Sequence, residues 1–146
     1  MSVGERNDRT RAQQTTQHAG KILRLRDDGT VPPDNPFVGR SGFRPEIYSY
    51  GHRNPQGLTI HPGTGELWET EHGPRGGDEL NRILPGRNYG WPVATFGREY
   101  SGDLIANQPF REGMEPPVTI WVPSIALSGM LFYHCDRHTL AFRSHG

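Results

Sequence analysis

The stretch YGHRNPQGLTIHPGTGELWETEHGPRGGDELNRILPGRNYGWP, residues 50–92, decides how the whole chain is interpreted. Residues 58–61 and 66–71 are rich in strand-forming side chains, and the Pro-Gly-Thr-Gly sequence between them has the composition of a turn. We therefore expect a β-hairpin. Polar residues stand at the strand ends, with Arg53 and Asn54 ahead of the first strand. Loops that leave a sheet commonly carry functional side chains, so we expect the site there.

Short predicted strands also flank this stretch on both sides. Residues 21–25 and 46–50 alternate polar and apolar side chains, and residues 118–121 and 128–133 are short apolar runs. Residues 78–84 fit either a strand or one helical turn, because periodicity does not discriminate over so few residues. Short strands separated by turns are typical of a sandwich, a barrel or a propeller. The predicted fold class is therefore all-β.

The composition favours a loop-rich β protein and excludes several partner classes. Of the 146 residues, 32% are hydrophobic, and 19 are Gly and 13 Pro. The 16 basic and 16 acidic residues cancel, so neither nucleic acid nor an anionic membrane is an expected partner. No apolar run approaches the roughly 20 residues of a membrane span, and the first residues lack the apolar part of a signal peptide. As written, the chain is expected in the cytoplasm. Its single Cys135 excludes an internal disulfide.

A set of motifs in this order and spacing resembles the soluble pyrroloquinoline-quinone (PQQ) sugar dehydrogenases. The motifs are Gly-His-Arg-Asn-Pro-Gln-Gly at 51–57, Glu-His-Gly-Pro at 71–74, Asp-Glu-Leu-Asn at 78–81 and Asn-Tyr-Gly-Trp-Pro at 88–92. That family includes the glucose, sorbosone and aldose sugar dehydrogenases. The resemblance implies a six-bladed β-propeller, of which this chain would supply roughly half of the ring. The alternative is a small stand-alone β domain that shares the motifs.

The resemblance also divides the chain into three parts. Residues 1–19 form a polar N-terminal segment, interpreted as a solvated loop or a frayed terminus. Alternatively, Gly4-Glu5 resembles a Gly-Asp turn that faces the active site in the family. Residues 20–133 are the expected central blades. Residues 134–146 are an atypical tail that departs from the family pattern, as a frameshift near Tyr133 would produce. Its His134, Cys135 and His138 are a weak zinc signal, because a matching fourth ligand is missing.

The resemblance assigns functional roles to seven residues. Arg53 and Asn54 match the pair that contacts the quinone cofactor, and a guanidinium suits carboxylate or quinone oxygens. Trp121 matches a residue in the wall of the cofactor and sugar pocket. The carbonyls of Gly73 and Pro74 match those that bind the Ca²⁺ beside the quinone, and Glu79 with the backbone of Tyr89 resembles a second, structural Ca²⁺ site.

Each of these roles has a structural alternative. Arg53 could form a surface ion pair with Glu46 or Asp78, and residues 73–77 could be a simple turn. Glu79 could be an exposed carboxylate at a strand end, and Trp121 could belong to the core.

The activity implied by the resemblance is oxidation of an aldose at its anomeric carbon. Hydride passes from the sugar to the quinone, a lactone forms, and an external acceptor removes the electrons. The family's general-base His belongs to a segment absent from this sequence, so no catalytic residue is assigned and the chain alone is expected to be inactive. Full-length relatives are expected in the periplasm. The rival interpretations are a non-enzymatic ligand-binding propeller module or an inactive truncated product.

Overall fold

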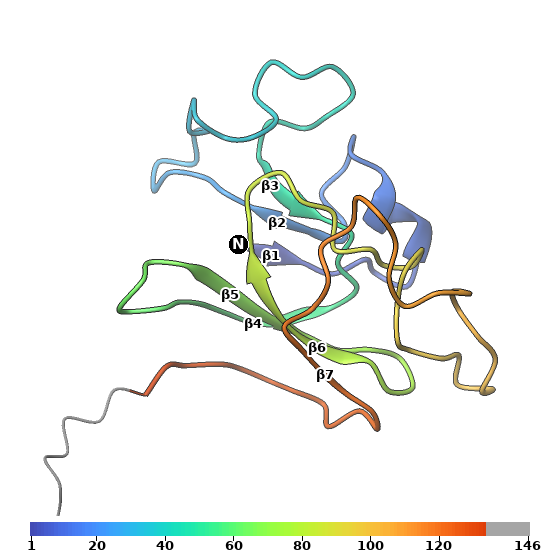
Figure 1. Ribbon diagram of the computed structural model, residues 1–146. Helices are drawn as coiled ribbons and strands as arrows, with labels where there is room; N and C mark the ends of the chain where they lie inside the picture. Colours follow the sequence, from blue (N-terminus) through green and yellow to red (C-terminus); the bar gives the residue numbers. More distant parts are fainter. Residues whose placement is uncertain (134–146) are drawn as a thin grey trace, which may run out of the picture.

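The protein folds into two antiparallel sheets joined by loops, as seen in a computed structural model that describes residues 1–133. The predicted atypical tail, with the weak zinc signal, lies outside the described residues. The first sheet has the order β1-β2-β3 and the second the order β4-β5-β6-β7. Their bounds are β1 Ser2–Val3, β2 Lys21–Leu23, β3 Ile47–Tyr50, β4 Pro55–Ile60, β5 Leu67–Glu71, β6 Asp78–Ile83 and β7 Thr119–Trp121, and a short 3₁₀ helix covers Arg9–Gln13 (Figure 1). The all-β prediction is confirmed.

The predicted hairpin is present as β4 and β5. In its register Leu58 faces Glu69 and Ile60 faces Leu67 across the two strands. Gly65 ends the turn with φ +72, a conformation that a residue without a side chain adopts at little cost, and its amide donates to the His61 carbonyl at 2.9 Å. The open choice for residues 78–84 is also decided in favour of a strand, because β6 pairs with β5 from Glu79 to Ile83 and with β7 from Asp78 to Leu80.

The prediction of a strand over residues 128–133 is wrong. A Cβ added at Gly57 in β4 would lie 2.9 Å from the Met130 amide nitrogen. Because Cβ atoms point out of a sheet face, this segment crosses the face of the second sheet rather than extending its edge. It packs through Phe132, whose ring centroid lies 4.4 Å from that of His61 and 6.0 Å from that of Trp68. Phe132 is partly buried there, whereas Leu131 and Tyr133 are 76% and 82% exposed, so the segment lies on the sheet without pairing with a strand.

The interpretation of residues 1–19 as a frayed or solvated segment is also wrong in part. Ser2 and Val3 pair with β2, and Ala12 in the 3₁₀ helix is fully buried. Gly20 makes this packing possible, since an added Cβ would lie 2.6 Å from the Ala12 Cα atom. The segment is polar around Ala12, so its sequence shows no sign that the contact of Ala12 with Gly20 is buried and anchors the segment.

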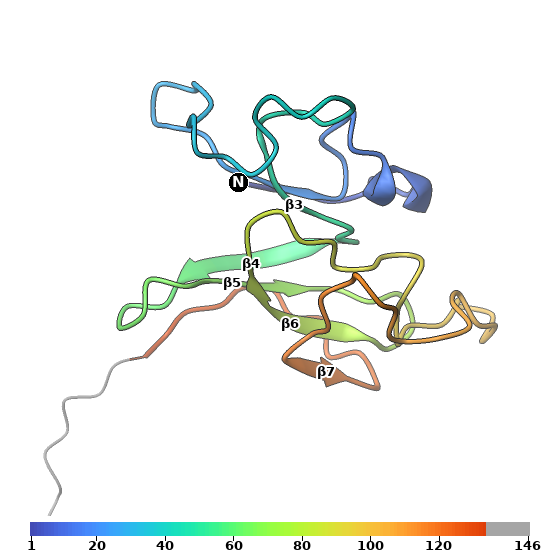
Figure 2. The same cartoon turned by 45° about the horizontal axis from the view of Figure 1, so that its top comes forward.

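Apolar contacts between the two sheets hold them together. Ile22, Ile83 and Tyr89 form one buried cluster, against which Tyr48 and Leu58 pack. Burying a side chain of this size stabilises the fold by about 1.5–3 kcal/mol. Viewed along the layers, the first sheet lies above the second, as successive blades of a propeller would (Figure 2). In the described part of the chain no helix is long and apolar enough to span a membrane.

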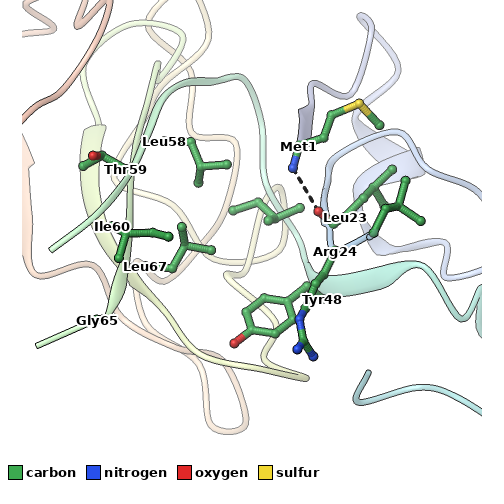
Figure 3. Close-up of a pocket in the computed structure, with 11 residues that line it drawn as sticks. Met1, Leu23, Arg24, Tyr48, Leu58, Thr59, Ile60, Gly65 and Leu67 are labelled. Carbon is green, nitrogen blue, oxygen red and sulfur yellow. Dashed lines mark hydrogen bonds between the residues drawn. The ribbon is translucent and has the colours of Figure 1, made fainter. Parts of the chain in front are cut away.

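A large hollow lies between the sheets, away from the predicted site. It has a volume of about 780 Å³ and is lined by Leu23, Tyr48, Leu58, Ile60 and neighbouring residues (Figure 3). None of the seven residues assigned a role from the sequence lines it. The hollow is therefore separate from the predicted site.

The burial of Lys21 can be tested by the pH dependence of the free energy of unfolding. It is fully buried in β2, and its ammonium donates to the carbonyls of Arg11, Ala12 and Ala19. Burial lowers the pKa of Lys21 to about 8 from its ordinary 10.5. Between these values the unfolded chain binds more protons, so the free energy of unfolding should rise with pH, by up to about 3 kcal/mol. Urea unfolding across this window measures the rise. It should disappear in Lys21→Met, and an unchanged pH slope in that variant would contradict the assignment.

Candidate functional site

Residues 51–54 carry the chain from the first sheet to the second and place Arg53 at the centre of the site. The Arg53 guanidinium donates through Nη1 to the carbonyl oxygens of His72 at 2.9 Å and Gly73 at 3.0 Å. It also lies over the indole of Trp91, 5.5 Å from the ring centroid, at a distance where a cation is attracted to an aromatic face. Within residues 1–133 no carboxylate lies within ion-pair distance of this guanidinium, so the surface ion pair with Glu46 or Asp78 does not form.

Glu71, the last residue of β5, holds the backbone of the Arg53-Asn54 pair. Its Oε2 accepts hydrogen bonds from the amides of Arg53 at 2.5 Å and Asn54 at 3.2 Å. The Glu71 side chain is almost fully buried, so these charge-assisted bonds are shielded from water. Glu71 is not among the residues with a role predicted from the sequence. A signal was present, because Glu69 and Glu71 alternate along a strand whose next element is also acidic.

The loop between β5 and β6, residues 72–77, presents the Gly73 carbonyl. A Cβ at Gly73 would lie only 2.1 Å from the Gly76 carbonyl oxygen, so the loop folds back on itself too tightly for any other residue. The Gly73 amide donates to Asp78 Oδ1 at 2.9 Å. The loop is therefore fixed from both sides of Gly73, by Asp78 at its amide and by Arg53 at its carbonyl.

Asp78 also ties this loop to the segment that follows β7. Its carboxylate accepts from Ser124 Oγ at 2.5 Å and from the amides of Ile125 at 2.9 Å and Ala126 at 2.7 Å. Burial acts to raise the pKa of Asp78, but the hydrogen bonds, that of Ser124 foremost, outweigh burial and hold the pKa below its usual value. One buried carboxylate thus joins two loops that are 46 to 48 residues apart.

Glu79 lies beside Arg53 and Gly73 in a small cavity that Tyr89 and Trp91 also line. Burial, and then the charge of Glu71, raise the pKa of Glu79 to about 8. The exposed-carboxylate alternative for Glu79 is therefore wrong, because the side chain is 8% exposed. The Tyr89 hydroxyl donates to the Arg82 carbonyl and accepts from the Leu84 amide, so Tyr89 can offer a ligand only through its backbone carbonyl.

The remaining predicted residues lie around this centre. Asn54 and Arg53 line a hollow of about 220 Å³ with Gly4 and Glu5, whose amide donates to the Arg53 carbonyl at 2.9 Å. The suspected Gly4-Glu5 turn therefore does face the Arg-Asn pair. Trp121 contributes its carbonyl, which accepts from Gly77, while Trp91 is the indole in the cavity with Arg53. The assignment of Trp121 to the pocket wall stays a prediction.

Comparison with known proteins places this geometry in a family. The family described as Glucose / Sorbosone dehydrogenase matches residues 1–143. The chain belongs to this family. It is 50% identical over 139 residues to an aldose sugar dehydrogenase of Escherichia coli (strain K12), covering 94% of this chain and 38% of that protein. A crystal structure of a glucose dehydrogenase superposes with a TM-score of 0.91 at 55% identity, over 94% of this chain and 40% of that one.

A further solved relative bears on the cofactor. The PQQ-bound form of an aldose sugar dehydrogenase from Streptomyces coelicolor superposes with a TM-score of 0.63 at 40% identity, over 81% of this chain and 30% of that one. The chain thus spans well under half the length of these glucose and sorbosone dehydrogenase relatives. The family resemblance and the partial propeller predicted from the sequence are confirmed.

Proposed function

We propose that this member of the glucose and sorbosone dehydrogenases supplies the quinone- and calcium-binding part of a PQQ-dependent aldose dehydrogenase. The observation that carries the proposal is the position of Arg53, whose guanidinium lies between the Gly73 carbonyl and the Trp91 face. A cation beside an aromatic surface suits a planar, polyanionic quinone. The substrate class is an aldose, the electrons leave to an external acceptor, and the whole protein works in the periplasm.

The residues present fit calcium at two positions. The Gly73 carbonyl is a hard oxygen ligand that the tight loop presents outward to Arg53, and Pro74 follows it in the same loop. Glu79 is a buried carboxylate whose Oε2 lies 3.3 Å from Asn81 Nδ2, and no cationic side chain of residues 1–133 pairs with it to give charge compensation. A divalent cation between Glu79 and the Tyr89 carbonyl would supply that compensation.

Arg53 and Asn54 would hold the quinone and the Gly73 and Pro74 carbonyls the Ca²⁺; when bound, the quinone would supply a hydride acceptor and the Ca²⁺ a Lewis acid. Arg53 binds the anionic oxygens of the ligand and stabilises negative charge as it grows. Glu71 fixes the Arg53 and Asn54 amides, so both side chains start from a defined backbone position. Trp91 presents its ring face to the guanidinium, which attracts the cation and restricts its position. Asp78 holds the Gly73 loop in the conformation that presents its carbonyl.

The test uses a chimera, defined as the E. coli relative in which residues 1–133 of this chain replace the matching segment. Purified chimera is titrated with PQQ at fixed Ca²⁺ and then assayed for dye reduction with glucose. Saturable PQQ binding followed by sugar-dependent dye reduction is the expected result. Sugar binding without PQQ binding would instead favour the rival, a non-enzymatic binding module, and would overturn the proposal.

Calcium should stabilise the chimera through Glu79. A ligand that binds only the folded state raises stability by about 2.7 kcal/mol at one hundred times its dissociation constant. We therefore expect Ca²⁺ to raise the melting temperature, and Glu79→Ala to remove part of that gain. Glu66→Ala is the matched control, since Glu66 is a partly exposed residue paired with Arg82. Equal Ca²⁺ responses in the two variants would remove Glu79 from the site.

A further inference from the structure

One face of β5 and β6 gathers polar side chains that are all buried. In the antiparallel register Glu69 faces Asn81 and Glu71 faces Glu79. Residues opposite each other, and residues two apart on a strand, share a face of the sheet. The exposed fractions are 0% for Glu69 and Asn81, 3% for Glu71 and 8% for Glu79. Three carboxylates and an amide are therefore held together out of water by strand pairing alone.

The hydrogen bonds within this face do not satisfy it. Asn81 Nδ2 lies 3.1 Å from Glu69 Oε2, 3.4 Å from Glu71 Oε1 and 3.3 Å from Glu79 Oε2. An amide nitrogen carries two protons and cannot serve three carboxylates fully. Glu69 Oε1 and Asn81 Oδ1 have no partner within the described residues, although both residues are fully buried. Orphaned oxygens of this kind are rare in folded proteins and indicate an absent hydrogen-bond donor, water or cation, and among three buried carboxylates a cation is the partner that also balances the charge.

The imidazole of His52 adds a ring nitrogen to this group of buried carboxylates. Its Nδ1 lies 3.4 Å from Glu71 Oε1, and ligand-capable atoms of His52, Glu69 and Glu71 all lie within 4.8 Å of one another. A separation of 3.4 Å is long for a hydrogen bond. This separation is the one expected between two ligand atoms that each lie about 2.1 Å from a tetrahedrally coordinated ion. The ring is already oriented, because it stacks on Tyr89 with centroids 4.7 Å apart and Nε2 lies 2.8 Å from Ser49 Oγ.

We propose that His52, Glu69 and Glu71 bind one divalent transition-metal cation of the zinc or manganese type, with the amide oxygen of Asn81 as a further ligand. A half-turn of the Asn81 amide exchanges its oxygen and nitrogen and presents a hard oxygen ligand to the cation that lies among the carboxylates. The Ser49 hydroxyl then accepts from the Nε2–H of His52, the second contact that orients a metal-bound imidazole. Imidazole suits these metals, whereas Ca²⁺ takes oxygen ligands, so the chemistry differs from that of the Gly73 and Glu79 positions.

The surroundings agree with a cation site. Burial, and then the charge of Glu71, raise the pKa of Glu69 well above its ordinary value, so a proton and a metal would compete for the same oxygens. The site also joins two parts of the chain, because His52 lies in the link between the sheets and Glu69 lies within β5. Glu71 Oε2 keeps its bonds to the Arg53 and Asn54 amides, so the cation would stiffen the support of that pair.

The experiment is a Co²⁺ titration of metal-stripped chimera in excess Ca²⁺ and without quinone, followed by the visible absorption of the bound Co²⁺. It does not depend on the proposed function, because it measures neither quinone nor sugar. One Co²⁺ should bind per chain. Glu69→Gln and His52→Asn should each weaken binding at least ten-fold, as loss of a ligand does. Glu66→Gln, the same chemical change at a partly exposed position on the same hairpin, should leave binding unchanged.

If Glu69→Gln or His52→Asn fails to fold, a variant that should bind Co²⁺ more tightly still tests the site. Asn81→Asp replaces an amide oxygen by a carboxylate and should tighten Co²⁺ binding, because a charged oxygen is a stronger ligand for a divalent cation. Three results would overturn the site: no Co²⁺ bound by the unsubstituted chimera, complete displacement of Co²⁺ by Ca²⁺, or equal affinities in Glu69→Gln, Asn81→Asp and Glu66→Gln.

Discussion

Replacing Asp78 by alanine should lower the free energy of unfolding of the chimera by about 3 kcal/mol or more. Four donors lose their acceptor at once: the Gly73, Ile125 and Ala126 amides and the Ser124 hydroxyl. A hydrogen bond to a charged group contributes about 1.5–3 kcal/mol, and an unsatisfied buried donor adds its desolvation cost. Ala126 is also held at φ +55, a conformation that costs energy in a residue other than glycine and that Asp78 helps to maintain. Urea unfolding measures the change.

Two control variants distinguish the loss of all four hydrogen bonds to Asp78 from the loss of a single hydrogen bond. Ser124→Ala removes one of the four donors and should cost about 1 kcal/mol. Asp28→Ala removes an exposed turn carboxylate whose hydrogen-bond partner among residues 1–133 is Thr30, and it should change stability by less than about 1 kcal/mol. If Asp78→Ala and Asp28→Ala have equal stabilities, Asp78 does not join the two loops.

Replacing Arg53 by alanine should weaken PQQ binding to the chimera by roughly ten-fold to a hundred-fold, since a charge-assisted hydrogen bond contributes about 1.5–3 kcal/mol. Folding should suffer less, because the Arg53 guanidinium bonds carbonyls at the edge of a cavity and leaves no unpaired carboxylate behind. Fluorescence titration with PQQ at fixed Ca²⁺ measures the affinity, and thermal melting without PQQ measures the fold.

Arg53→Lys and Arg87→Ala are the control variants for the PQQ titration of Arg53→Ala. Lysine keeps the charge but loses the planar fork, so its PQQ affinity should fall between those of the unsubstituted and alanine proteins. Arg87 is an exposed arginine paired with Glu115, and Arg87→Ala should bind PQQ normally. An Arg53→Ala protein that binds PQQ as tightly as Arg87→Ala would remove Arg53 from the cofactor site and with it the main support for the proposed function.

Most of the fold could be predicted from local patterns. The hairpin of β4 and β5, the strands β2, β3 and β7, and the loop that contains Gly73 follow from alternation and turn chemistry, which act between near neighbours. Residues 128–133 could not be predicted in this way, because an apolar run is equally suited to pairing at an edge and to packing across a face. The closeness of Met130 to Gly57 decides between the two and is not a local property.

By itself, the sequence determined the family, the all-β class and the placement of Arg53, Asn54 and Gly73 in loops at strand ends. Only the tertiary structure decided that Arg53 reaches the Gly73 carbonyl across 20 residues and that Glu69, Glu71, Glu79 and Asn81 share one buried face. The physical reason is strand register. Propensity and turn chemistry set the dihedral angles of single residues, whereas the pairing of one strand with another determines which side chains meet and whether water reaches them.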